Sequence, residues 1–169
     1  MAIEKLSEIL KRVEKENLIE GLCEQTGKGV GLNLRLGKVS QWMEGYAVGF
    51  DSKGLDYRQA GWRNVADCQG ARFLAECDQE DLVTSQILKP GVYYRVETVE
   101  KLNVPTDLLP DVRSTQLLVD NGLRLEVPGG IEPGYTGAIR MGLVNQNSFS
   151  VPIRLGSPIC RVVFHKVEE

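Results

Sequence analysis

Apolar residues near the start of the chain repeat with the period of an α-helix. Four of them fall at positions i, i+3, i+4 and i+7 and so share one helical face: Leu6, Ile9, Leu10 and Val13. Ser7 or a neighbouring residue can cap the start of such a helix, and positive charges gather toward its C-terminal half, where they suit the helix dipole. The pattern predicts one short amphipathic helix over residues 5–16, docked on the remainder of the chain.

After residue 21 the pattern changes to the alternation of a half-buried strand. Residues 30–37 (VGLNLRLG) alternate apolar and polar positions with a period of two. Further strand-like runs follow, punctuated by turns rich in glycine, proline and asparagine: 46–50, 82–88, 91–99, 115–119, 123–127, 137–145, 150–155 and 159–167. Strands at this spacing, without helices between them, predict a β-sandwich or barrel and disfavour a parallel α/β sheet. Residues 51–82 are polar and irregular, and we expect a loop or an insertion there.

Composition and charge narrow the classes of protein to consider. The 169 residues, 42% hydrophobic and 25% charged, suit a single globular domain over residues 1–169. A formal net charge of -3 provides no general attraction to nucleic acid or to anionic lipid. No apolar run approaches about 18 residues, and the N-terminus has no apolar core of the signal-peptide type. We therefore expect a cytoplasmic chain with no membrane span.

Two kinds of chemistry find little support in the residue types. The four cysteines form no C-x-x-C pair and there is one histidine, His165, so a zinc site of clustered ligands is not expected. A single histidine within an apolar run also disfavours a Ser-His-Asp or Cys-His arrangement. Free thiols and a structural histidine are the expectation.

Five segments of the chain occur in an order that is typical of one protein superfamily. They are LSEILKRVEKENLI (6–19), VGLNLRLGKV (30–39), the segment 88–126 that begins LKPGVYYRVETVEKL, GGIEPGYTGAIRMGLVN (129–145) and VPIRLGSPICRVVF (151–164). This order resembles the superfamily of deoxycytidine triphosphate (dCTP) deaminases and deoxyuridine triphosphatases (dUTPases), and matches the deaminase branch best. The resemblance covers most of the chain except residues 38–80.

The resemblance implies a fold, an assembly and a ligand. The fold would be all-β, a distorted jelly roll of the dUTPase-like (β-clip) type, with the short N-terminal helix attached. The assembly would be a homotrimer whose sites lie between subunits and take a pyrimidine deoxynucleotide. Magnesium would be bound through the phosphates of that nucleotide, and no residue of the chain is expected to hold a metal directly.

The resemblance also implies which residues contact the nucleotide. The matching positions are, in the segment 129–137, Gly130, Ile131 and Tyr135, and, outside it, Arg113, Ser114 and Arg161. In this superfamily the backbone of a hairpin faces the base, and an aromatic side chain packs against the deoxyribose. A turn containing serine, together with basic residues, holds the triphosphate.

The acidic positions depart from the superfamily pattern. Glu132 stands where the superfamily has an aspartate, which in the dUTPases orients the attacking water, so Glu132 is the candidate catalytic residue. In the deaminases a glutamate ten residues further on transfers protons as general acid and base, but this chain has Gly142 there. Asn33 replaces another aspartate, and Asp120 stands at the position of a catalytic arginine.

These positions leave three hypotheses for function. The first is an enzyme of pyrimidine deoxynucleotide metabolism that hydrolyses dUTP to dUMP and diphosphate, which Glu132 and Gly142 favour over deamination of dCTP. The second is a nucleotide-sensing or assembly trimer that has lost catalysis. The third is a β-sandwich interaction module unrelated to the superfamily. Whether the chain is an enzyme stays open between them.

Overall fold

The computed structural model describes residues 3–23, 27–42, 50–51, 54–55, 62–67 and 85–167. The helices are α1 (Leu6–Glu16) and α2 (Gln116–Asp120). The strands are β1 (Ile19–Glu20), β2 (Gly27–Lys28), β3 (Gly31–Trp42), β4 (Phe50–Asp51), β5 (Gly54–Leu55), β6 (Trp62–Asp67), β7 (Ser85–Leu88), β8 (Tyr93–Asn103), β9 (Leu108–Ser114), β10 (Leu123–Glu126), β11 (Thr136–Asn145), β12 (Val151–Arg154) and β13 (Pro158–Lys166). Strands therefore dominate the described part of the chain.

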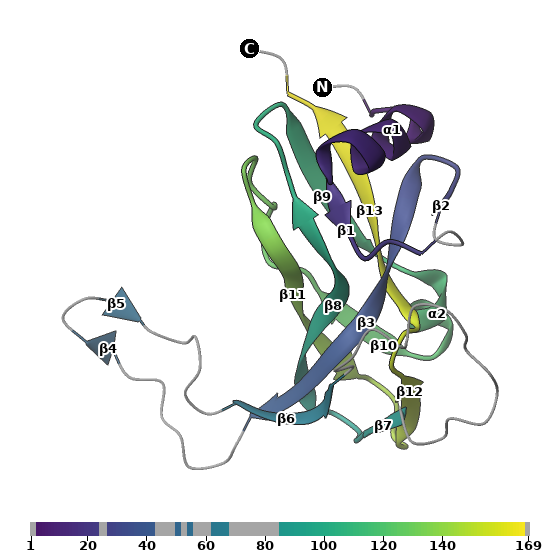
Figure 1. Ribbon diagram of the computed structural model, residues 1–169. Coiled ribbons are helices and arrows are strands. Elements are labelled where there is room, and N and C mark those ends of the chain that lie inside the picture. Colours follow the sequence, from purple (N-terminus) through teal and green to yellow (C-terminus); the bar gives the residue numbers. More distant parts are fainter. Residues whose placement is uncertain are drawn as a thin grey trace.

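Most strands join one main sheet with the order β10-β11-β8-β3-β13-β9 (Figure 1). Strand β1 extends it beside β8, whereas β2 and β6 pair with β3, and all of these pairings are antiparallel. The long strand β3 pairs with β13 through its first half and with β8 through its second half, so one strand joins the two halves of the sheet. Smaller two-stranded sheets are formed by β7 with β12 and by β4 with β5. The prediction of an all-β chain is confirmed.

Helix α1 confirms the predicted N-terminal helix and lies at the end of the sheet where both chain termini are found (Figure 1). Its inner face buries Ile9 and packs Leu6 and Val13 against the core. Leu10, the fourth residue of the predicted apolar face, stays 38% exposed. Burial of this face, rather than helix propensity alone, stabilises so short a helix.

The ends of α1 differ from the predicted cap. The N-cap residue is Lys5 and makes no side-chain capping hydrogen bond, so the expected side-chain cap at Ser7 or a neighbouring residue is wrong. At the other end Asn17 adopts a left-handed backbone with φ of 52°, and its N–H bonds to the carbonyl of Arg12. Asparagine is one of the few residues that enter this conformation readily, so the helix stops there.

Of the run 115–119, predicted to be a strand, residues 116–119 lie in helix α2 and Thr115 is its N-cap. Only Leu118 of this run is buried, and Leu117 and Val119 are exposed. Gln116 donates to the carboxylate of Asp120 at 2.6 Å, a contact between positions i and i+4 that a strand would not make. Three consecutive apolar residues, 117–119, do not reveal a period, which explains the wrong prediction.

Several short strands and two longer ones, β6 and β9, lie where the sequence predicted none. Strand β9 contains Pro110, which argues against a central strand, but β9 is the last strand of the sheet path and pairs there only with β13. Strand β6 lies inside the segment 51–82, for which the sequence predicted a loop or an insertion, and it pairs with β3. Most of the remainder of 51–82, and of the predicted strand 46–50, lies outside the described residues.

Candidate functional site

The glycine-rich segment 129–137 connects β10 to β11 and reverses the chain, as the sequence predicted. Gly134 and Gly137 adopt φ values of +83° and +129°, which side chains other than glycine rarely allow. The N–H of Tyr135 donates to the carbonyl of Glu132 at 3.2 Å and closes the turn around Pro133. The frame of the predicted hairpin is therefore present.

Backbone hydrogen bonds tie this hairpin to the connection between β8 and β9. The N–H of Val104 donates to the carbonyl of Tyr135 at 2.8 Å, and the N–H of Gly134 donates to the carbonyl of Val104 at 3.0 Å. Ile131 is buried, whereas Gly130 is exposed. Main-chain contacts thus position the hairpin without depending on the identity of its side chains.

The two polar side chains of the hairpin have different surroundings. The hydroxyl of Tyr135 donates to the carbonyl of Ala138 at 2.6 Å, and burial raises the pKa of this half-buried phenol, which keeps it protonated as a donor. Glu132 is exposed, and its carboxylate makes no hydrogen bond or ion pair with the part of the chain that the structure describes. Glu132 is therefore free to orient toward water or a ligand.

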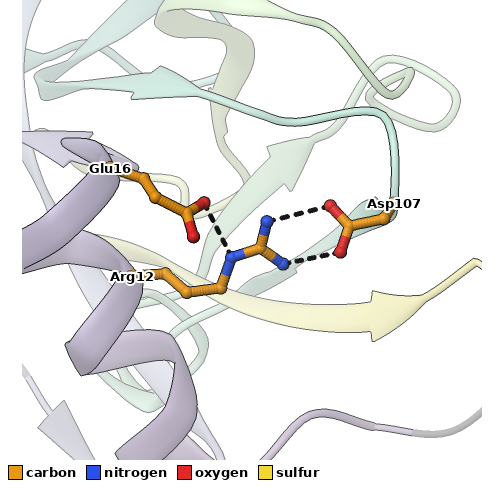
Figure 2. Close-up of polar contacts among 3 residues, drawn as sticks. All are labelled: Arg12, Glu16 and Asp107. Atoms are coloured by element: carbon orange, nitrogen blue, oxygen red, sulfur yellow. Dashed lines mark hydrogen bonds and ion pairs between the residues drawn. The ribbon is translucent and has the colours of Figure 1, made fainter.

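An ion pair holds the connection between β8 and β9 against helix α1 (Figure 2). The guanidinium of Arg12 donates to both oxygens of Asp107, at 2.8 and 2.9 Å, and to the carboxylate of Glu16 at 2.9 Å. The hydrogen bond from Arg12 lowers the pKa of Asp107, and the same bond raises the pKa of Arg12. This bidentate pair fixes Asp107 three residues from Val104, the residue that holds the hairpin.

The candidate phosphate-binding residues lie on β9 and β13. Arg161 is the direct cross-strand partner of Arg113 on one side and of Asn33 on the other, so these three positions share one face of the sheet. Arg113 donates twice to Asp111, at 2.9 and 2.6 Å. Ser114, at the end of β9, is exposed. Arg113 and Arg161 thus lie opposite each other on β9 and β13, whereas Ser114, the next residue of β9, pairs with Cys160.

The position that carries Gly142 is covered by a tyrosine ring. A Cβ atom built on Gly142 would lie 2.5 Å from Cζ and 2.7 Å from Cε2 of Tyr93, and still closer to its hydroxyl. Gly142 is flanked in register by Glu126 of β10 and Arg95 of β8. Any side chain at residue 142 would have to displace Tyr93.

Two segments that lie far apart in the sequence, 30–39 and 88–126, meet where β3 pairs with β8. The fully buried carboxylate of Glu100 accepts hydrogen bonds from the backbone N–H of Arg35 at 2.7 Å and from its Nε at 2.6 Å. Thr98 donates to the carbonyl of Glu100 and accepts from the N–H of Ile139, where the register of β11 with β8 shifts. These residues position the sheet beneath the site, and sequence analysis assigned them no role. The signal in the sequence was a polar residue at a strand position whose alternation points it toward the core.

The predicted residues form two groups rather than one. The hairpin residues Gly130, Ile131, Glu132 and Tyr135 precede or begin β11, whereas Arg113, Ser114 and Arg161 belong to β9 and β13. Strands β8 and β3 separate β11 from β13 along the sheet. The sheet order of one chain thus does not place the two groups on neighbouring strands.

The described residues contain few candidates for other chemistry. Within them, no three His, Cys, Asp or Glu side chains gather as a metal-binding group, and no helix is long and apolar enough to cross a membrane. Cys23 and Cys160 are free thiols, and burial raises the pKa of Cys160 to about 12, which makes it a poor nucleophile. Cys68 and Cys77 lie outside the described residues.

The all-β fold and the glycine-framed hairpin are the features that the resemblance to the dUTPase-like superfamily implies for this chain. A family model described as dCTP deaminase-like matches residues 3–167. The chain therefore belongs to the dCTP deaminase-like family, which confirms the resemblance seen in the sequence.

Individual relatives agree with this assignment. The chain is 31% identical over 93 residues to a "dCTP deaminase, dUMP-forming" of Methanoculleus marisnigri, which covers 54% of this chain and 50% of the relative. It is 25% identical over 158 residues to a dCTP deaminase of Thermococcus gammatolerans, covering 94% of this chain and 80% of the relative. The matched region thus spans about half the length of the first of these relatives.

A solved structure shows the same fold. The crystal structure of 2′-deoxycytidine 5′-triphosphate deaminase from Agrobacterium tumefaciens superposes with a TM-score of 0.69 at 16% identity. The match covers 98% of this chain and 48% of that chain. At this identity the likeness establishes the fold, and the dUTPase-like, distorted jelly-roll prediction is confirmed.

Proposed function

We propose that this chain binds a pyrimidine deoxynucleoside triphosphate and hydrolyses dUTP to dUMP and diphosphate. Its membership of the dCTP deaminase-like family supports the class of ligand. The name of the Methanoculleus relative describes a deaminase that forms dUMP from dCTP. Conversion of a triphosphate to a monophosphate requires loss of diphosphate as well as of the amine. A chain that releases diphosphate but does not remove the amine would act on dUTP.

The contact between Tyr93 and Gly142 carries the choice of hydrolysis over deamination. The superfamily resemblance implies a glutamate at residue 142 as the proton-transferring group of deamination. Glycine has no such group, and the ring of Tyr93 occupies the space in which a side chain would begin. The carboxylate of Glu132 remains exposed on the hairpin, where it can accept a proton from the attacking water.

The paired arginines support the phosphate end of the proposed site. Like charges directly opposite each other on neighbouring strands repel, and Arg113 and Arg161 are such a pair. Asp111 offsets part of this charge through its two hydrogen bonds with Arg113. A polyphosphate would meet positive charge from both arginines. Magnesium would arrive bound to those phosphates and neutralise their charge, because the described residues offer it no cluster of ligands.

The proposed site is completed by a second copy of the chain. Because β8 and β3 separate the hairpin from the arginine pair along the sheet, the hairpin of one subunit would meet the arginines of another in a homotrimer. Light scattering of the purified chain should give about three times the monomer mass. A monomer that still turns over nucleotide would contradict this arrangement.

Nucleotide turnover tests the proposal directly. Purified chain with magnesium should convert dUTP to dUMP and diphosphate and leave dCTP unchanged. Glu132→Ala should lower the rate at least roughly 100-fold, as for loss of a general base. The matched control Glu14→Ala, an exposed carboxylate on α1, should keep the full rate. Absence of turnover with dUTP would reject hydrolysis, and deamination of dCTP would reject the role assigned to Gly142.

One observation favours a second candidate, a nucleotide-sensing or assembly trimer without catalysis. The guanidinium of Arg113 is already engaged by Asp111, so a phosphate would have to displace that carboxylate. Thermal unfolding with a panel of deoxynucleotides separates the candidates. A nucleotide at 100 times its dissociation constant should stabilise the chain by about 2.7 kcal/mol. Stabilisation without turnover would support sensing, and no stabilisation by any nucleotide would leave only assembly.

A further inference from the structure

Helix α1 and the hairpin 129–137 are both bonded to the connection between β8 and β9, residues 104–107. On the side of the helix, the guanidinium of Arg12 donates to both carboxylate oxygens of Asp107, at 2.8 and 2.9 Å (Figure 2). On the side of the hairpin, Val104 donates its N–H to the carbonyl of Tyr135 and accepts from the N–H of Gly134. The connection thus links the N-terminal helix to the hairpin.

The end of α1 is bonded to the residue just before this connection. Asn103, the last residue of β8, donates its backbone N–H to the carbonyl of Leu18 at 2.9 Å. Its side-chain amide donates to the carbonyl of Asn17, the C-cap of the helix, at 2.9 Å. The helix and its cap are therefore bonded on both sides of Val104, at Asn103 and at Asp107.

The connection itself is short and stiff. Pro105 locks one of its backbone torsions, and the N–H of Leu108 donates to the carbonyl of Pro105 at 3.3 Å and closes a turn. The carbonyl of Asp107 also accepts from the N–H of Val167 near the C-terminal end of the chain, at 2.9 Å. A displacement of Asp107 is therefore transmitted through a stiff turn to Val104 and to the hairpin bonded there.

The pair of Arg12 and Asp107 suits a role in orientation better than a role in overall stability. Ion pairs near the surface usually contribute little to stability, whereas a bidentate fork fixes the geometry of its two partners. The side chain of Arg12 is 23% exposed, and Glu16 of the same helix accepts from its Nε at 2.9 Å. The guanidinium is thus oriented by its own helix toward Asp107, whose side chain is 47% exposed.

We propose that Arg12 is a positioning residue for the hairpin. Through Asp107 and Val104 it sets where the hairpin presents its backbone and the carboxylate of Glu132 to a nucleotide. The proposal rests on the proposed function for the ligand and adds to it a residue of α1 that does not touch the ligand. Misplacement of a reacting group by about 1 Å can lower a rate by roughly two orders of magnitude. A small displacement of the connection is therefore sufficient for a measurable effect.

Hydrogen exchange of the intact chain measures this coupling without any ligand. In Arg12→Ala the amides of Val104 and Gly134 should exchange roughly threefold faster or more, because the connection loses its bidentate partner. The amide of Leu36, which donates to the carbonyl of Ser157 elsewhere in the fold, reports general loss of stability in the same sample. It should change less than the two hairpin amides.

Turnover measures what the coupling contributes to the reaction. Arg12→Ala should lower kcat/KM for dUTP at least roughly tenfold. Arg12→Lys keeps the charge without the fork and should lie between Arg12→Ala and the unaltered chain. The matched control is Lys11→Ala, because the ion-pair partner of Lys11 is Glu8 of the same helix. This control should leave both the exchange rates and the turnover unchanged.

Two results would overturn the proposal. One is exchange at Val104 and Gly134 that rises no more than exchange at Leu36, which would mean a purely structural role. The other is unchanged turnover of dUTP in Arg12→Ala. A chain that turns over no dUTP would reject the proposed function, and the exchange rates, which need no ligand, would then decide the role of Arg12.

Discussion

Strand β11 contains two regions that differ in what holds them in place. At its start, the hairpin 129–137 is fixed by backbone hydrogen bonds to Val104 and by the glycine conformations of its turn. Further along, the surface around Gly142 is shaped by side chains and their ion pairs. A site held by the main chain keeps its shape when an aspartate becomes a glutamate. A site built from side chains changes its chemistry when a single residue is replaced.

A β-bulge separates the two regions. The pairing of β11 with β8 shifts between Ala138 and Arg140, and the N–H of Ile139 bonds to the hydroxyl of Thr98 at 2.9 Å instead of to a strand partner. An extra residue in one strand re-aims the side chains that follow it. The bulge therefore sets which residues of β11 lie on the same face as Gly142. Substitutions can therefore be chosen that affect one side of this bulge or both.

Removal of the buried carboxylate beneath both regions should have the largest effect on stability. Glu100→Ala leaves Arg35, whose side chain is 12% exposed, without its partner and should cost about 3–5 kcal/mol of unfolding free energy. The matched control is Glu97→Ala on the same strand, whose partner Arg140 is 60% exposed, and it should cost below about 1 kcal/mol. Denaturant unfolding of both variants measures the difference, and equal costs would contradict the role of Glu100.

Loss of the bulge contact should affect both regions at once. Thr98→Val keeps the shape of the side chain but leaves the buried N–H of Ile139 without an acceptor, at a cost of about 1–3 kcal/mol. We expect dUTP turnover, which depends on the hairpin, to fall in this variant. Hydrogen exchange of the Ile139 amide and of the amides of β11 that follow it should also speed up. A change confined to one side of the bulge would show that the bulge does not couple the two regions.

Restoring a carboxylate at residue 142 tests the region around Gly142 alone. Gly142→Glu should destabilise the chain by about 1–2 kcal/mol, since the new side chain overlaps the ring of Tyr93. Tyr93 is 47% exposed and can move, so the cost stays modest. The double variant with Tyr93→Ala should recover stability in a double-mutant cycle. Additive costs would mean that the two residues do not compete for the same space.

The smallest expected effect concerns the support of the hairpin from α1. Asp107→Asn weakens the pair with Arg12 and should cost below about 1 kcal/mol at neutral pH, because Asp107 is 47% exposed. Arg12 lowers the pKa of Asp107 from its usual 3.8 in the folded chain. The contribution of the pair is therefore complete above the unfolded pKa and is lost as pH falls through the lowered folded pKa. The difference in melting temperature between the unaltered chain and Asp107→Asn should therefore be smaller at pH 3 than at pH 7. An equal difference at both pH values would contradict the role of the ion pair.

Local sequence patterns predicted much of the fold and the turn of the hairpin 129–137. The helix at residues 5–16 and most strands from residue 82 onward follow from periodicity, because burial of one face imposes a repeat on the sequence. The hairpin follows from its glycines, whose positive φ values are a local requirement of the chain. Helix α2 and strand β9 could not be predicted from such local patterns. A short apolar run has no readable period, and Pro110 is tolerated only because β9 is the end of the sheet path.

The sequence by itself determined the family, the all-β fold and the hairpin that contains Glu132, since these depend on residues close together along the chain. Only the tertiary structure decided that Tyr93 covers Gly142, that Arg113 faces Arg161, and that Glu126 and Arg95 flank Gly142 across the sheet. Those contacts join residues of different strands. The register of antiparallel pairing creates them, and register is set by burial across the whole sheet rather than by any one segment.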